Sequence, residues 1–362
     1  MQKKLLFAIQ FVFATTLYAQ QLPAGFTLIK NNAALPVKNQ GMSGTCWCFS
    51  STSLTESELL HNYNNNLELS EAFTVWNLYI DKAEKYIRRR GNARFSEGGL
   101  EQDVFYAIDN YGAMPETIYP GIGRDTILNH DEEMHGKLQA YLDTLLKNYP
   151  DTIPLNWKDG YKKILSSYLG TPPSNFIYNG NAYTPITFAQ AYVKIHLDDF
   201  SGFTSFTHHP FYASFVMEVP DNYNDNMYYN LPLDSLIAIT RKSVLNGYTI
   251  SWDADVSNNG FIFEKGFAML LQKNNDDINV PQITEAPYNQ QIRQTLFDKQ
   301  VTQDDHLMQI TGLAKDANGK KFFIVKNSWG TSNPCAGYML VSIPYFAINT
   351  ISVLVDKNAI KY

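Results

Sequence analysis

The order of helical and strand patterns along the chain limits its fold more than any other feature. Residues 20–120 carry apolar residues mostly at the spacing of amphipathic helices, whereas residues 201–362 carry alternating and β-branched runs. Runs such as 322–325 and 338–343 are typical of strands. Because helices and strands are segregated along the chain, we expect an α+β fold with a helical lobe, a β-rich lobe and a cleft between them.

Three helices are expected in the first of these parts. The first begins near Cys46 and runs to about Asn62. Ser70 is a typical N-cap for the second helix, and Gly112 is a typical residue to end the third. The strand-rich part is expected to contain one helix, over residues 233–246.

Residues 121–200 interrupt this two-part plan. They are more charged than their surroundings, predict helices over 133–148 and 157–169, and are broken by prolines such as Pro154. We interpret this segment as a helical insertion between the two lobes.

The N-terminal segment differs from the rest of the chain. A lysine pair precedes an apolar run, Leu5 to Leu17, which is too short to span a bilayer and is followed closely by Ala19. We therefore expect residues 1–19 to be a signal peptide, and the remaining protein to be exported to the periplasm or the extracellular space. A buried N-terminal helix or a membrane anchor is the alternative. No later segment is long and apolar enough to predict a membrane span.

The charge of the chain argues against a polyanionic partner. The formal net charge is −6, and the longest basic run is Arg88 to Arg90, at the end of a predicted helix. Cations in that position stabilise the helix dipole, so the run needs no nucleic-acid ligand to explain it. We expect no nucleic-acid partner.

Residues 39–50, which read NQGMSGTCWCFS, place a cysteine at the start of a helix. Unsatisfied N–H groups and the dipole at a helix N-terminus favour the thiolate form of Cys46, which is the nucleophilic form. Gln40 can turn its side-chain NH₂ group toward the same point, where it and the Cys46 backbone N–H would hold an oxyanion. The alternative is that Cys46 is a small buried core residue. The chain has three cysteines, so at least one thiol is free or pairs between chains.

His306, far downstream, is expected to lie beside Asn327. Residues 316–319 read DANG, a hairpin turn signal, and the midpoint between His306 and Asn327 falls inside this turn. A symmetric hairpin therefore places the two side by side on neighbouring strands, and a bulge would move the register by a residue or two. A neutral amide can hold the imidazole in one tautomer and orientation, and Trp329 is placed to shield that contact from water. A surface histidine at a strand end is the alternative.

The two segments resemble the active-site regions of papain-like cysteine peptidases, and most closely those of bleomycin hydrolase and bacterial aminopeptidase C. The resemblance covers residues 36–120 and, more loosely, 201–362. Ser43 stands where papain itself has a half-cystine, and the expected partner position is also polar. The separation of Cys46 and His306 greatly exceeds the roughly 130–150 residues of papain, and the insertion supplies the excess.

By this resemblance, Cys46 is the nucleophile, His306 the base, Asn327 the orienting amide and Gln40 the oxyanion donor. The resemblance implies hydrolysis of peptide bonds in a peptide or protein substrate through a thioester, without a cofactor. The bleomycin hydrolase branch implies an aminopeptidase. A papain-like endopeptidase is the alternative, and a catalytically silent binding protein of the same fold is disfavoured because all four residues are present.

The resemblance also implies residues that contact the substrate. Gly99 and its neighbour Gly98 are expected to pair with the extended peptide, although a plain loop is the alternative. Asp305 and the covering Trp329 are expected at the same cleft.

Some residues are not expected to take part in the chemistry. His208 and His209 have no third ligand at metal spacing, so we expect no metal site. Cys48 is expected to be a packing residue. The sequence does not assign Cys335, the natural substrate or the oligomeric state, nor does it say whether the six residues after Asp356 reach the cleft.

Overall fold

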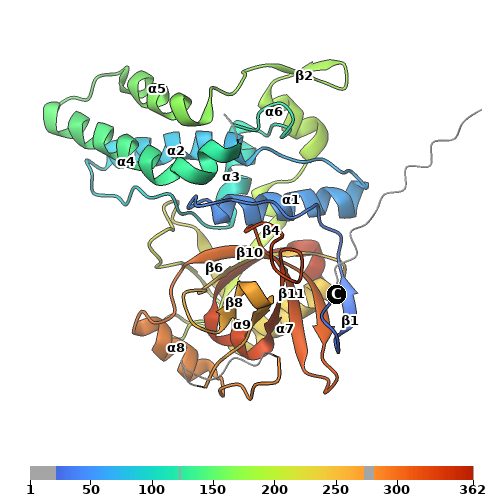
Figure 1. Ribbon diagram of the computed structural model, residues 1–362. Helices are drawn as coiled ribbons and strands as arrows, with labels where there is room; N and C mark the ends of the chain where they lie inside the picture. Colours follow the sequence, from blue (N-terminus) through green and yellow to red (C-terminus); the bar gives the residue numbers. More distant parts are fainter. Residues whose placement is uncertain (1–21, 122–123, 273–280, 362) are drawn as a thin grey trace, which may run out of the picture.

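The computed structural model describes residues 22–121, 124–272 and 281–361, and the predicted signal peptide lies outside these residues. Two layers are visible in Figure 1: helices occupy the upper half and a large sheet with its own helices occupies the lower half. The helix that begins at Cys46 lies at the boundary between the two layers.

Within the residues that the structure describes, the helical layer contains five long helices. They are α1 (Cys46–Tyr63), α2 (Glu71–Arg88), α3 (Gln102–Tyr111), α4 (Arg124–Asn148) and α5 (Trp157–Leu169). Two helix boundaries predicted from the sequence are present in the structure. Ser70 caps α2 by accepting a hydrogen bond from the Phe73 N–H at 3.0 Å, and Gly112 follows α3 with a φ of 83°.

The insertion predicted at 121–200 contains more than helices. It includes a hairpin, formed by β2 (Phe176–Tyr178) and β3 (Asn181–Tyr183), and a short helix, α6 (Pro185–Phe188). A short π-helix, η1 (Ala189–Val193), and a 3₁₀ helix, η2 (Leu197–Asp199), follow. The hairpin turn is Asn179-Gly180, and both residues have positive φ. Because an Asn-Gly pair is a strong signal for a tight hairpin turn, this element was recognisable in the sequence although we did not predict it.

Among the described residues, eleven strands form one sheet in the order β5-β6-β4-β13-β7-β10-β11-β12-β9-β8, with β1 paired to β10. The strands are β1 (Thr27–Asn31), β4 (Phe200–Thr204), β5 (Ser214–Val216), β6 (Met227–Asn230), β7 (Ile250–Ala254), β8 (Phe261–Ile262), β9 (Phe267–Ala268), β10 (His306–Lys315), β11 (Lys321–Lys326), β12 (Tyr338–Ser342) and β13 (Thr350–Asp356). The helices α7 (Leu233–Leu245), α8 (Gln290–Asp298) and α9 (Ile343–Asn349) and the turn η3 (Phe263–Lys265) accompany the sheet. Of these, only α7 was predicted.

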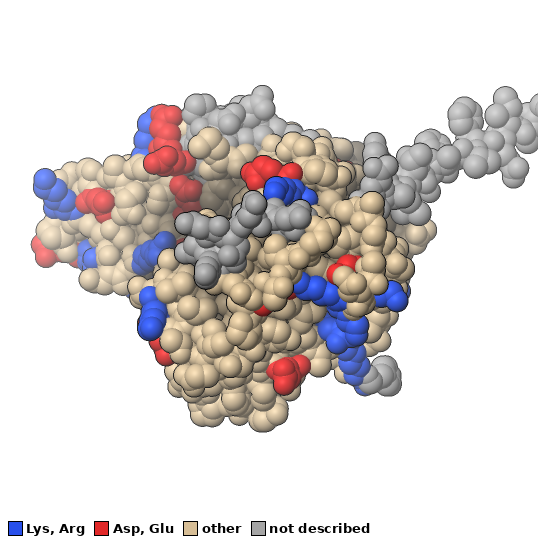
Figure 2. Space-filling model, turned by 60° about the horizontal axis from the view of Figure 1, so that its bottom comes forward, with Lys and Arg blue, Asp and Glu red and all other residues tan. Residues whose placement is uncertain are grey.

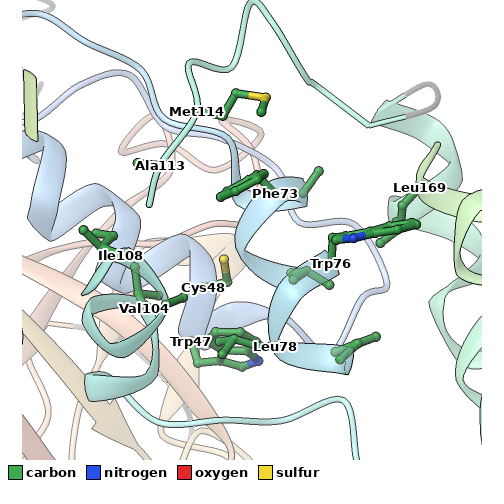
Figure 3. Packing of buried hydrophobic residues seen from close by; sticks show 14 of the residues in the cluster. Trp47, Cys48, Phe73, Trp76, Leu78, Val104, Ile108, Ala113, Met114 and Leu169 are labelled. Atoms are coloured by element: carbon green, nitrogen blue, oxygen red, sulfur yellow. The ribbon is translucent and has the colours of Figure 1, made fainter. Parts of the chain in front are cut away.

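Helix α1 joins the two layers, and its two faces differ in chemistry. Toward the helices it presents Trp47 and Cys48, which pack among apolar side chains of α2 and α3 such as Trp76 and Val104 (Figure 3). Toward the sheet it presents hydroxyl groups: Ser50 Oγ lies 2.7 Å from the carbonyl oxygen of Met308. This packing holds the first residue of α1 near the first residues of β10.

The surface in Figure 2 is mainly uncharged, with Lys and Arg in small groups among separate Asp and Glu residues. Within the described residues, we find no helix that is both long and apolar enough to cross a membrane.

Candidate active site

A cleft of about 610 Å³ lies where the N-terminal end of α1 meets the start of β10. Seven of the eight predicted site residues line it: Gln40, Cys46, Gly98, Gly99, Asp305, His306 and Trp329. The eighth, Asn327, is 2% exposed and hydrogen-bonds to His306. Residues from both halves of the chain thus meet at one cleft, as predicted.

Cys46 is the first residue of α1 and is 8% exposed. Burial raises the pKa of its thiol to about 12, and the negative charges of Asp304 and Asp221 also raise it. Hydrogen bonds from the backbone N–H groups of Leu307 and Trp47 lower the pKa. The predicted effect of the helix N-terminus is therefore present but is outweighed by burial, because a thiolate taken out of water loses its hydration.

His306 is the first residue of β10, and its ring Nε2 lies 2.8 Å from Asn327 Oδ1. If Nε2 carries the proton, Nδ1 is left as the ring nitrogen that can accept a proton from a thiol. Burial lowers the pKa of His306 to about 4, while the Asn327 hydrogen bond and the charge of Asp305 act in the opposite direction. The Ser328 N–H also donates to Asn327 Oδ1, at 2.7 Å, which fixes the amide.

The hairpin that joins these two residues differs from the symmetric one we predicted. Gln309 pairs with Lys326, so Asn327 falls at the level of Met308, two residues from His306. The register shifts between Ile310 and Gly312, where β10 contains a bulge. His306 and Asn327 are thus diagonal neighbours, and such neighbours are still within reach of each other's side chains.

Gln40 is held in place from both ends of its amide. Its Oε1 accepts a hydrogen bond from Ser328 Oγ at 2.5 Å, and its Nε2 donates to the Ser43 carbonyl at 2.8 Å. An amide NH₂ group has two hydrogens, so one remains for an oxyanion beside the Cys46 backbone N–H. Ser328 was missed in the sequence, although it lies next to the predicted Asn327.

Trp329 covers the histidine. Its ring centroid lies 4.6 Å from that of His306, with the two planes 30° apart. Phe261 and Phe263 pack edge-on against the indole at 5.7 and 5.3 Å. These aromatic rings exclude water from one side of the imidazole and so strengthen its hydrogen bond to Asn327.

Gly98 and Gly99 lie where no side chain fits. A Cβ on Gly98 would be 1.9 Å from Asp221 Oδ2, and one on Gly99 would be 3.0 Å from the Trp47 ring. The Lys82 ammonium donates to the carbonyls of Ser96 and Gly98 and thereby holds this segment. The backbone here can come close to an extended ligand in the cleft.

Several cleft residues were not anticipated from the sequence. They are Ser43, Gly44, Arg94, Phe95, Ser96, Glu97, His135, Asp221, Val256, Asp304 and Leu307. Asp304 lies two residues before His306, so it could have been suspected. Asp221 comes from the loop between β5 and β6, and nothing in the sequence pattern connects it to the cleft.

The structure also corrects the argument about His208 and His209. Their Nε2 atoms lie 2.9 and 3.2 Å from Glu218 Oε2, so a third group of metal-binding type is present. The sequence argument missed it because Glu218 lies across a turn of the chain. These residues are outside the cleft, and the carboxylate already pairs with both rings.

The other two cysteines are buried in packing environments. Cys48 is fully buried, and its Sγ is 3.6 Å from the carbonyl oxygen of Glu71. Cys335 lies under Gly266, where an added Cβ would be 2.6 Å from its Sγ. Neither lines the cleft.

The C-terminal residues dock on α7. The turn η4 (Lys357–Ile360) follows β13. The carbonyl oxygen of Ala359 accepts a hydrogen bond at 2.8 Å from Asn246, which directly follows α7, and that of Ile360 accepts one at 3.3 Å from Lys242 of α7. The described part of the tail, up to Lys361, does not line the cleft.

Two family profiles match the chain. The one described as the Peptidase C1-like family matches residues 96–362, and the one described as papain family cysteine protease matches residues 22–148. Together they include both segments that meet at the cleft.

Individual proteins are similar over most of the chain. Aminopeptidase C of Streptococcus thermophilus is 23% identical over 89% of this chain and 80% of its own length. Bleomycin hydrolase of Mus musculus is 21% identical over the same shares of both chains. The crystal structure of PepW from Lactobacillus rhamnosis superposes with a TM-score of 0.72, at 21% identity, over 92% of this chain and 82% of that one. The last similarity shows that the fold is shared.

Proposed function

This chain belongs to the Peptidase C1-like family, and from that premise we propose that it is a cysteine aminopeptidase that removes N-terminal residues from peptides. The single observation that carries the proposal is the hydrogen bond of 2.8 Å between His306 and Asn327, in the wall of the cleft that also holds Cys46. The relatives named aminopeptidase C and bleomycin hydrolase, each similar over most of the chain, support the restriction to N-termini.

The reaction proceeds by acyl transfer. Cys46 Sγ attacks the peptide carbonyl, and its proton passes to His306. The carbonyl oxygen becomes an oxyanion that accepts hydrogen bonds from Gln40 Nε2 and the Cys46 N–H. His306 then gives the proton to the leaving amine as the C–N bond breaks, which leaves a thioester on Cys46. Water attacks this thioester, His306 takes the water proton, and the thiol and the carboxylic acid are released.

The ionisation of the two central residues is coupled. Burial opposes a lone thiolate at Cys46 and a lone imidazolium at His306, because each charge has lost its hydration. When the proton moves from one to the other, the two opposite charges form together and attract each other at short range. We propose that Asn327 orients the imidazole for this transfer, and that Trp329 keeps water away from it.

Endopeptidase activity is the second candidate function. It is favoured by the position of the tail, because residues up to Lys361 dock on α7 and leave the cleft open. An aminopeptidase therefore needs another group in the cleft that distinguishes a free N-terminus from a continuing chain.

We further propose that the protein is exported after cleavage near Ala19. The lysine pair and the short apolar run that follows it support this proposal. Fractionation of cells that express the full chain, with N-terminal sequencing of the product, tests it. A cytoplasmic protein that keeps residues 1–19 would contradict it.

Matched reporter peptides test the proposed activity. A leucyl reporter with a free amine should be cleaved with a higher kcat/KM than its N-acetylated counterpart, and Cys46→Ala should abolish both reactions. A preference for the N-acetylated reporter would favour the endopeptidase instead.

A further inference from the structure

Carboxyl groups gather at one end of the cleft, beside Gly98. Asp221 comes from the loop between β5 and β6, and Asp304 comes from the segment before β10. A Cβ placed on Gly98 would be 1.9 Å from Asp221 Oδ2, so this carboxylate touches the backbone that we propose to pair with the substrate. Asp304 accepts a hydrogen bond from the backbone N–H of Asp221, which holds these two residues of separate chain segments together.

A third carboxyl group lies directly behind them. Asp253 of β7 is 0% exposed and is paired in register with Leu307. Among the described residues, no N–H or hydroxyl group donates to either of its oxygens or to Asp304 Oδ2. Asp253 and Asp304 are neighbours that can hydrogen-bond only through a shared proton. Buried carboxyl oxygens without a donor are costly, so this arrangement requires an explanation.

Other acidic residues of the region are satisfied within the protein. Glu101 accepts hydrogen bonds from Tyr228 and Ser352 at 2.5 and 2.7 Å. Asp103 accepts from the Leu100 N–H and from Asn226, both at 2.8 Å. The oxygens that lack donors are therefore concentrated on the pair of Asp253 and Asp304.

Two cations in this part of the described structure contact other groups. Arg94 reaches the other oxygen of Asp221, Oδ1, at 3.5 Å, and that oxygen also accepts from Ser96 at 3.0 Å. Lys82 donates to backbone carbonyls. Burial and the neighbouring charges of Asp221 and Glu101 raise the pKa of Asp304 to about 8, as expected for buried carboxyl groups close to one another.

We propose that Asp221, Asp304 and the buried Asp253 form a subsite for a primary ammonium group of the peptide, the α-ammonium of its first residue or the side chain of a lysine. An ammonium has three N–H donors, Asp221 and Asp304 both line the cleft, and the buried Oδ2 of Asp304 has no hydrogen-bond partner among the described residues. A cation in this position removes the repulsion between the carboxylates and supplies the missing hydrogen bonds. The proposal rests on the proposed function, because the α-ammonium of the substrate would be the group that marks a free N-terminus.

Four matched reporters separate the two sources of the ammonium. They are leucyl, N-acetyl-leucyl, N-acetyl-lysyl-leucyl and N-acetyl-norleucyl-leucyl derivatives of one fluorescent amine. They are tested on the intact protein and on the isosteric variants Asp221→Asn and Asp304→Asn. Asp225→Asn is the control, since Asp225 lies on the same loop but pairs with Lys85 at 3.0 Å and does not line the cleft. Thermal unfolding verifies that each variant is folded.

The variants should raise KM for the ammonium-bearing substrate and lower its kcat/KM about 10- to 100-fold, as expected for a lost hydrogen bond to a charged group. The neutral reporters and the Asp225→Asn protein should change little. A loss confined to the leucyl reporter assigns the subsite to the α-ammonium. If the variants reduce the ratio of kcat/KM for the lysyl reporter to that for the norleucyl reporter, the subsite binds a lysine side chain. An equal loss on all four reporters, or no loss on any, would overturn the proposal.

A binding measurement keeps this inference separate from the proposed activity. Calorimetry on the Cys46→Ala protein should show leucinamide binding that is at least about tenfold weaker once Asp304→Asn is added. Binding of N-acetyl-leucinamide should not change. If leucinamide and N-acetyl-lysyl-leucinamide each bind equally well to both proteins, the subsite is wrong even where the enzyme is an aminopeptidase. If the intact protein cleaves no reporter, the binding measurement still shows whether the subsite binds an ammonium group.

Discussion

Burial acts on Cys46 and His306 in opposite directions on the pKa scale. It raises the pKa of the thiol to about 12 and lowers that of the imidazole to about 4. The sequence indicated the nucleophile through its position at a helix N-terminus. The extent to which burial raises the pKa of its thiol depends on other residues of the cleft, such as Leu307 and Trp329, that come from elsewhere in the chain. The ionisation state of a site is therefore not readable from a local segment.

The first prediction compares two cysteines of the same helix. Cys46→Ala should reduce kcat by at least about 10³-fold, because the attacking atom is lost. Cys48→Ala should leave kcat within a few-fold and lower the free energy of unfolding, because Cys48 is fully buried against α2. Steady-state kinetics and urea unfolding of both variants provide the test. Near-native turnover by Cys46→Ala would refute the assignment of the nucleophile.

The second prediction separates the base from the residue that positions it. His306→Ala should lose more activity than Asn327→Ala, because the amide orients the ring and transfers no proton. The profile of kcat against pH should be bell-shaped, with an acid limb that belongs to the coupled pair. The Asn327 hydrogen bond raises the pKa of His306, so in Asn327→Ala the acid limb should move to lower pH. A shift to higher pH, or a larger loss for Asn327→Ala, would contradict these roles.

At the scale of elements, helix α1 shows where sequence reasoning succeeds and where it stops. Its start was predictable from the loop glycines, such as Gly44, that precede Cys46, and it ends at Tyr63, one residue beyond the predicted end near Asn62. Its Ser- and Thr-rich face gave no sign of burial, yet Ser50, Ser53 and their neighbours are buried against the sheet. Small hydroxyl groups bury well only where the partner strand offers acceptors, and that depends on the tertiary fold.

The third prediction concerns the contact between α1 and β10. Gln309 of β10 accepts from Ser53 Oγ at 2.7 Å and donates to Ser57 and Thr249 at 2.8 and 2.9 Å. Gln309→Ala leaves these buried groups without partners, so it should lower the free energy of unfolding by about 2–4 kcal/mol. Gln291→Ala, at an exposed position of α8, is the control and should change it by less than about 0.5 kcal/mol. Equal stability of the two variants in urea unfolding would show that the network contributes little.

At the scale of the whole molecule, the division into helical and strand-rich parts was predictable, because it rests on patterns of period 3.6 and period 2 that are local. The meeting of Cys46, His306 and Asn327 was predictable through the resemblance and the hairpin signal. The acidic end of the cleft was not, because Asp221, Asp253 and Asp304 come from three separate segments that only the sheet order brings together. The bulge in β10 was likewise invisible in the sequence, since it depends on pairing with two neighbours.

The fourth prediction links stability to pH through Glu58. Burial and the charge of Asp356 raise the pKa of Glu58 to about 8 from an ordinary 4.5, so the folded protein holds a proton there that the unfolded chain releases. Stability from this residue is therefore present below about pH 4.5 and is lost as the pH rises toward 8. Relative to the intact protein, Glu58→Gln should gain about 4 kcal/mol of stability between pH 4.5 and 8.5. The exposed Glu132→Gln is the control. A difference that stays constant with pH would contradict the shift.

The most direct test of the central claim is the mass of the trapped acyl-enzyme. The protein is mixed with an activated leucyl ester, quenched in acid within the first turnover and digested for mass spectrometry. We predict a leucyl thioester on Cys46, formed faster from the free amine than from the N-acetylated ester and absent in Cys46→Ala. An adduct on another residue, or an adduct that forms only from the N-acetylated ester, would contradict the account of a Cys46 aminopeptidase.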